Sequence, residues 1–133
     1  MTYTELNKQA EERISALPIV WGFSDKQIRE GAESKGIAVT DLRAIGAGGY
    51  VSVHHRKLVA SAFSLNMKER DLWLLDMKNL EEAFLYELGN HEFCITYDDV
   101  AVWEAVGVSL DDHTVEQMDA YLSARRTYLS QEH

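Results

Sequence analysis

The sequence predicts an α+β protein: a single compact domain over residues 1–133, with a mainly antiparallel sheet of three or four strands packed with five or six helices. Three observations lead to this prediction. Long segments repeat apolar residues at helical spacing, short segments are rich in β-branched and aromatic residues, and no linker, repeat or low-complexity stretch divides the chain. A chain of 133 residues with 46% hydrophobic residues is long enough to bury one core without a metal or a disulfide.

The first elements are a helix, a strand and a second helix. Residues 4–17 repeat apolar side chains at helical spacing, and the β-branched and aromatic residues 19–23 predict a short buried strand. Ser24 and Gln27 then form a capping box, in which each side chain bonds a backbone N–H of the other residue. The helix that they begin is expected to stop at Gly36.

A hairpin is expected next. Residues 41–45 and 50–53 resemble strands, and they flank the glycine-rich residues 46–49, which predict a tight turn with positive φ angles. A bend that leads into a helix is the alternative for this segment.

The second half of the chain is mainly helical. Residues 55–88 follow a helical pattern that polar segments break at 66–68 or at 76–79. Residues 93–97 predict another strand, because they are aromatic and β-branched. A last helix is expected over residues 112–129.

The charge of the chain is divided unevenly. Residues 1–66 carry 8 basic and 7 acidic side chains, whereas residues 67–133 carry 5 and 15, for a net charge of −10. Such acidity disfavours direct binding to nucleic acid, since that binding requires Lys and Arg at the phosphates. These carboxylates are either the solvated faces of helices or a surface for a basic partner. The candidate partner-binding residues are Glu69, Asp71, Asp76, Glu81, Glu82, Glu87, Glu92, Asp98, Asp99 and Glu104.

These carboxylates lack the sequence spacing of a metal site, and no metal or other cofactor is expected. Asp98 or Asp99 has a structural alternative as the cap of a helix that runs through Val106 and stops at Gly107.

The glycine turn offers a second candidate site. Consecutive backbone N–H groups at such a turn can bind an anion, and a basic run follows it closely in the sequence. The motif matches neither a P-loop nor a complete dinucleotide fingerprint, and a purely structural turn is the simpler interpretation. The candidate ligand-binding residues are Gly46, Gly48, Gly49, His54, His55, Arg56, Lys57 and His91.

His91 and Cys94 form a dense polar cluster with Glu92. A thiolate near a histidine can act as a nucleophile, but on a strand His91 and Cys94 would point to opposite faces. We therefore expect Cys94 to be structural and His91 to interact with the end of the preceding helix.

The large apolar residues are expected partly in the core and partly at the surface. Trp21, Trp73 and Trp103 are expected in the core, because each lies within an apolar pattern. Residues 72–75 are apolar at four successive positions, which one helix face cannot bury. Part of this run is therefore a candidate surface for a homo-oligomer or another partner.

Three segments carry a resemblance to a known family. The strings WGFSDKQIREG (residues 21–31), IGAGGY (45–50) and FLYELGNHEFCITYD (84–98) resemble a family of small uncharacterised proteins from bacteriophage, prophage and related bacterial genomes. The resemblance covers residues 19–108 and implies no activity. What it implies is a phage accessory protein, a class that includes inhibitors of host defence.

The sequence thus favours a non-enzymatic protein that binds a basic host protein, with no direct contact to nucleic acid or membrane. A lone cysteine, Cys94, and the lack of a signal peptide indicate a reducing compartment. The resemblance to phage proteins implies that this compartment is the bacterial cytoplasm. One alternative is a small-ligand or nucleotide-phosphate binder at the glycine turn, with or without hydrolytic activity. Another is a virion or assembly component.

Overall fold

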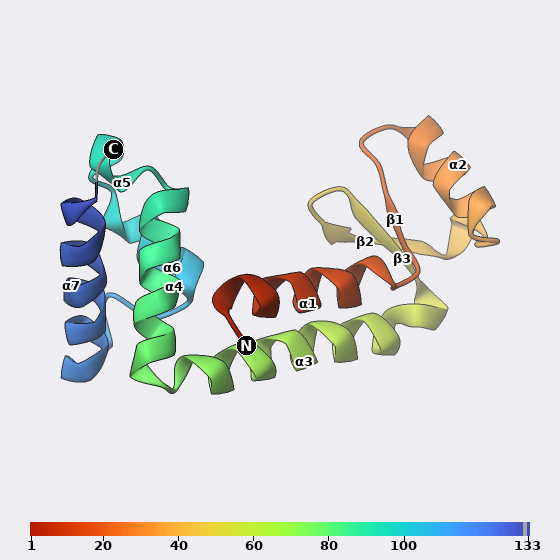
Figure 1. The fold of residues 1–133 in the computed structure, drawn as a ribbon. Helices are drawn as coiled ribbons and strands as arrows, with labels where there is room; N and C mark the ends of the chain where they lie inside the picture. The colour runs from red at the N-terminus through yellow and green to blue at the C-terminus, as the bar shows by residue number, and fades with distance from the viewer. Residues whose placement is uncertain (132) are drawn as a thin grey trace. The chain divides into compact units, whose positions relative to one another are not determined.

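The computed structural model describes residues 1–131 and 133. Within them it contains seven α-helices, two short 3₁₀ turns and one three-stranded antiparallel sheet (Figure 1). The predicted α+β class and antiparallel sheet are thereby confirmed, although five or six helices were predicted and seven are present in the described residues, because the segment predicted as a fourth strand is helical. The chain divides into two compact units, which we call the sheet unit (Asn7–Lys68) and the helical unit (Met1–Leu6 with Glu69–His133). Each unit has its own cluster of buried residues. A single domain stays a prediction.

The sheet unit is built around strand β3, which pairs with β1 on one side and β2 on the other. Buried Ile19, Val51 and Val59 form its core. The predicted first helix, first strand, second helix and hairpin are all present. The elements with residues in this unit are α1 (Tyr3–Ser15), β1 (Ile19–Trp21), α2 (Asp25–Ser34), β2 (Leu42–Gly46), β3 (Gly49–Ser52) and α3 (Arg56–Leu74).

The glycine turn joins β2 to β3 and has the left-handed backbone that the sequence predicts. Gly46, Ala47 and Gly48 have φ angles of +96°, +51° and +77°. The absence of side chains at the glycines also leaves room for two aromatic rings. A Cβ at Gly48 would lie only 2.8 Å from the ring of Phe23. A Cβ at Gly49 would likewise lie 2.9 Å from the ring of Trp21.

The start of α2 differs from the prediction in one bond. Ser24 Oγ accepts from the Gln27 N–H at 3.2 Å, as expected of the cap. The Gln27 side chain instead accepts from the backbone N–H of Phe23 at 2.9 Å, one residue earlier than a capping box requires. The predicted stop at Gly36 is confirmed, with a φ of +68°.

The helical unit is made of helices that pack on α4. The long helical segment breaks at the second of the two predicted places, where Asp76 caps α4. Helix α7 lies side by side with α4, and α6 also packs on it (Figure 1). The remaining helices are α4 (Met77–Asn90), α5 (Phe93–Thr96), α6 (Asp99–Val106) and α7 (Val115–Ser130).

The prediction of a strand over residues 93–97 is wrong, since this segment forms the short helix α5. Its backbone bonds are local: the Tyr97 N–H donates to the Phe93 carbonyl at 2.9 Å. The Cys94 N–H donates to the Tyr128 hydroxyl at 3.1 Å. The apolar residues that suggested a strand have another explanation, because Phe93 is buried among the aromatic rings of this unit.

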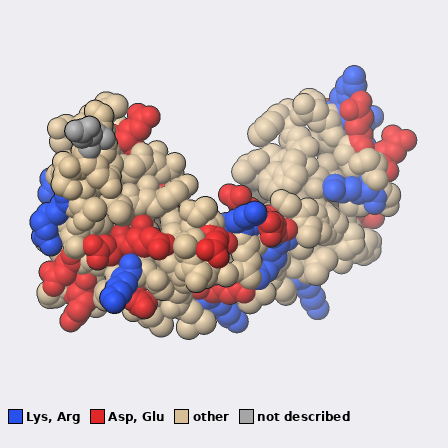
Figure 2. Space-filling model, viewed as in Figure 1, with Lys and Arg blue, Asp and Glu red and all other residues tan. Residues whose placement is uncertain are grey.

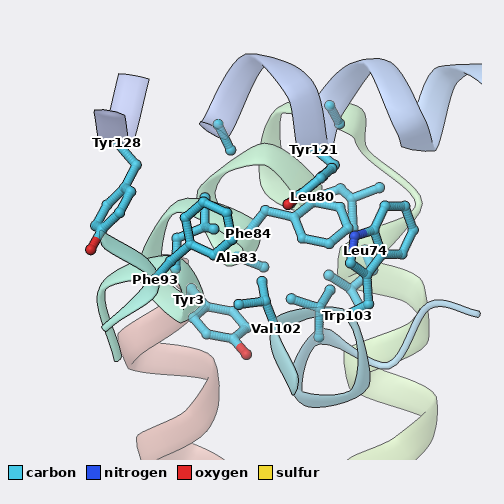
Figure 3. Packing of buried hydrophobic residues seen from close by; sticks show 14 residues of the cluster. Tyr3, Leu74, Leu80, Ala83, Phe84, Phe93, Val102, Trp103, Tyr121 and Tyr128 are labelled. Atoms are coloured by element: carbon cyan, nitrogen blue, oxygen red, sulfur yellow. The ribbon is translucent and has the colours of Figure 1, made fainter. Parts of the chain in front are cut away.

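The core of the helical unit is aromatic (Figure 3). The ring of Phe84 lies 4.7 Å from that of Trp103 and 5.2 Å from that of Tyr121, distances typical of favourable ring pairs. Trp103 is buried, as predicted. Trp21 was expected in the core as well, but its side chain is 52% exposed, because it ends β1 and lies over the glycine turn.

Among the described residues, no helix has both the length and the apolar character needed to cross a membrane.

Candidate partner-binding surface

The carboxylates predicted to meet a partner all belong to the helical unit. Figure 2 shows acidic side chains gathered over α4 and α7. Three of the predicted residues, Glu69, Glu81 and Asp99, are half-buried. Six are exposed: Asp71, Asp76, Glu82, Glu92, Asp98 and Glu104.

Glu87 does not belong to this surface, because it is only 6% exposed. The Tyr3 hydroxyl donates to its carboxylate at 3.0 Å, and His91 Nε2 lies 3.2 Å from the other oxygen. Arg70 Nη2 donates to the Tyr3 hydroxyl at 2.9 Å and extends the network. Sequence periodicity cannot reveal this role, since Tyr3 and Arg70 are far from Glu87 in the chain.

The same network affects the titration of Tyr3. Burial raises the pKa of the Tyr3 hydroxyl above its ordinary value, while the Arg70 guanidinium acts in the opposite direction. Arg70 also donates to the carbonyl of Val106 at 3.0 Å, so that it links α3 to the end of α6. The network of Tyr3, Arg70, Glu87 and His91 therefore connects four segments of the helical unit, a structural role.

Other carboxylates of the surface also stabilise local structure. Asp76 accepts from a first-turn N–H of α4 at 2.8 Å, and Asp98 accepts from the Ala101 N–H at 3.3 Å. The predicted cap of α6 is thus Asp98, and Gly107 stops the helix with a φ of +92°. Asp99 accepts from the Tyr121 hydroxyl at 3.3 Å. Burial, with a smaller contribution from Asp99, raises the pKa of Tyr121 to about 12.

A shallow groove runs along the acidic side of α4 and α7. It has a volume of about 330 Å³. A hydrogen bond joins its two sides: the Glu81 carboxylate on α4 accepts from the Ser123 hydroxyl on α7 at 2.6 Å. Glu116 and Asp119, on the first turns of α7, belong to the acidic half of the chain but were not among the candidate residues, although their spacing of three residues places them on one helix face. The lining residues are Met77, Lys78, Glu81, Glu116, Asp119, Ala120 and Ser123.

His91 is the helix-end residue that the sequence predicts. It is the C-cap of α4, and its backbone N–H donates to the Glu87 carbonyl at 2.9 Å. Cys94 is half-buried on α5, next to the Tyr128 hydroxyl. His91 and Cys94 do not lie on opposite faces of a strand, because α5 is helical. In the described part of the chain, no three His, Cys, Asp or Glu side chains are grouped as metal ligands.

The alternative ligand site is not assembled in the sheet unit. The glycine turn lies at the end of β2 and the start of β3, whereas His54 and His55 lie beyond the opposite end of β3, in a 3₁₀ turn. A strand of four residues separates them, a length of about 13 Å. His54 instead faces Asp41, with Nε2 3.6 Å from the carboxylate. His91 belongs to the helical unit.

The apolar run at residues 72–75 is divided between core and surface, as expected. Leu74 is buried, and the side chains of Leu72 and Leu75 are exposed. Trp73 is half-buried: its ring lies 5.7 Å from that of Tyr3, and its Nε1–H donates to the Met1 carbonyl at 2.9 Å.

The comparisons with known proteins place the chain in a family whose function is unknown. A family model described as "Family of unknown function (DUF7659)" matches residues 2–129. No curated protein and no solved structure matches the chain.

Proposed function

The chain belongs to this DUF7659 family of unknown function, and we propose that it acts by binding a basic protein through the acidic surface of its helical unit. The observation that carries the proposal is the separation of charge between the two units. The helical unit contains 4 Lys and Arg against 16 Asp and Glu, whereas the sheet unit contains 9 against 6.

The charge of this surface is expected to raise the rate of association more than it raises the affinity of the complex. An acidic surface of this kind attracts a basic partner over a distance of about 10 Å at ordinary salt and speeds the encounter. Affinity then depends on a few apolar contacts at the centre of the interface.

The proposal includes a biological setting. Basic protein surfaces commonly hold nucleic acid, so a partner of this kind would lose access to it when the acidic surface is bound. The phage-like motifs of the sequence favour a phage or prophage accessory protein, an inhibitor of a host nucleic-acid-binding or defence protein in the bacterial cytoplasm.

Capture from bacterial lysate tests the proposal. We expect the immobilised chain to retain a basic protein at about 50 mM NaCl and to release it at about 500 mM, because salt screens exposed charges. The variant Glu104→Lys/Glu116→Lys/Asp119→Lys should associate with that protein about tenfold more slowly.

The matched control changes the net charge by the same amount in the sheet unit. Glu11, Glu12 and Glu33 are exposed there, and their replacement by Lys should leave capture of the same protein unchanged. Equal losses in both triple variants, or capture that salt does not affect, would contradict a binding surface on the helical unit.

A further inference from the structure

The segment around α5 exposes apolar side chains within the acidic unit. Ile95 is 71% exposed and Tyr97 is 70% exposed, and Val100 follows at the start of α6 with half of its side chain in solvent. Glu92 and Asp98, which are both exposed, flank Ile95 and Tyr97 in the chain. Exposed apolar side chains with charged residues beside them are typical of protein interfaces, in which a polar rim surrounds an apolar core.

The segment is held in one conformation. Below Tyr97, the ring of Phe93 is buried and lies 5.7 Å from the tyrosine ring, edge to face. The Thr96 hydroxyl accepts from the Asp98 N–H at 3.2 Å. With the bond from the Cys94 N–H to the Tyr128 hydroxyl, these contacts order the segment before any partner arrives, which lowers the entropy lost on binding.

The backbone at both ends of α5 is strained. Glu92 and Tyr97 have φ angles of +50° and +52°, in the left-handed region. A residue with a side chain is less stable there by about 1–2 kcal/mol, and glycine would avoid this cost. Such strain is concentrated at functional sites, where the side chain itself is required.

We propose that Ile95 and Tyr97 are the apolar anchor of the acidic surface, and that they take a protein segment in which Lys or Arg side chains flank an apolar one. This inference rests on the proposed function and adds the position of the contact and the chemistry of the partner segment. Charge complementarity selects this occupant, because an apolar segment flanked by carboxylates would be repelled by Glu92 and Asp98.

Two synthetic peptides of equal charge test the inference: one alternates lysine with leucine, and the other contains lysine with glycine. The wild-type chain should bind the lysine–leucine peptide more tightly. Ile95→Ser/Tyr97→Asn should lower that affinity about tenfold and leave the lysine–glycine affinity unchanged, because truncating central interface residues typically costs a tenfold factor or more. Asparagine tolerates the left-handed backbone at position 97.

A matched variant controls for the loss of exposed apolar area. Val115 and Leu129 are also exposed in the helical unit, and Val115→Ser/Leu129→Ser should bind both peptides as the wild type does. The single variant Ile95→Ser, at a largely exposed position, repeats the test without altering position 97.

The outcomes separate the two proposals. An unchanged lysine–leucine affinity in the anchor variants, or an equal loss in the matched variant, overturns the anchor alone. A wild-type chain that binds neither peptide in a salt-dependent way overturns both the anchor and the acidic binding surface. Circular dichroism and urea unfolding of each variant confirm that a loss of binding is not a loss of fold.

Discussion

At the scale of single residues, burial decides what a carboxylate does. Glu82 is exposed and Glu87 is buried, although both lie on α4 and both were expected on the same surface. A buried carboxylate needs donors to replace water, and Tyr3 and His91 supply them to Glu87. Glu87 therefore has a structural role, and substitutions at this position test the stability of the protein and not its binding.

Replacing Glu87 by alanine should lower the free energy of unfolding by about 2–3 kcal/mol, since the Tyr3 hydroxyl loses its acceptor and the contact with His91 Nε2 is lost. Urea unfolding measures this change. Glu104→Ala, at an exposed position of α6, should stay within about 0.5 kcal/mol of the wild type. Comparable effects of the two substitutions would contradict the buried network.

Tyr121 should make stability depend on alkaline pH. Its pKa is raised from 10.0 to about 12, so the folded state favours the neutral phenol. The stability from this group is complete below its unfolded pKa and is lost as the pH rises toward about 12. We expect the urea midpoint of the wild type to decrease as the pH rises from 10.0 to about 12. The midpoint of Tyr121→Phe should decrease less steeply over the same range. An identical slope in the variant would show that other groups cause the loss.

At the scale of elements, α5 is the segment where local sequence and structure disagree. Its aromatic and β-branched residues are typical of a strand, yet Glu92 and Tyr97 enclose four residues of helix. The contacts of Phe93 and Tyr128 hold this conformation, and they come from packing on α7. Local propensity at α5 is therefore overruled by tertiary contacts.

Replacing Glu92 by glycine should stabilise the chain by up to about 1 kcal/mol, because relief of the left-handed strain exceeds the extra entropy that glycine has in the unfolded chain. Thermal or urea unfolding measures the gain. Glu92→Ala removes the same charge and keeps the strain, so it should bring no such gain. Equal stability of the two variants would mean that the backbone at position 92 is not strained.

At the scale of the whole molecule, charge is concentrated in one unit. The division at Leu6 and Glu69 assigns 16 of the 22 acidic side chains to the helical unit. Like charges at this density repel one another and destabilise the compact state. The proposed basic partner would neutralise part of this charge.

Added salt should therefore stabilise the free chain. We expect the thermal midpoint to rise by a few degrees between about 20 mM and about 300 mM NaCl, because salt screens the repulsion among exposed carboxylates. The triple variant at Glu104, Glu116 and Asp119 should show a smaller rise. A midpoint that falls with salt would indicate that attractive ion pairs outweigh the repulsion.

The sequence by itself determined the features that depend on neighbours in the chain. The cap at Ser24, the left-handed turn at residues 46–48 and the stop at Gly107 all follow from local chemistry, whereas the break before α4 was one of two places that the sequence left open. The excess of acidic residues is likewise a property of composition.

Only the tertiary structure decided which side chains meet across the chain. It buried Glu87 beneath Tyr3, exposed Trp21, separated the glycine turn from the histidines and turned residues 93–97 into a helix. The physical reason is common to all of these: burial and partners far away in the sequence set the energy of these residues, and neither is encoded in the spacing of nearby residues.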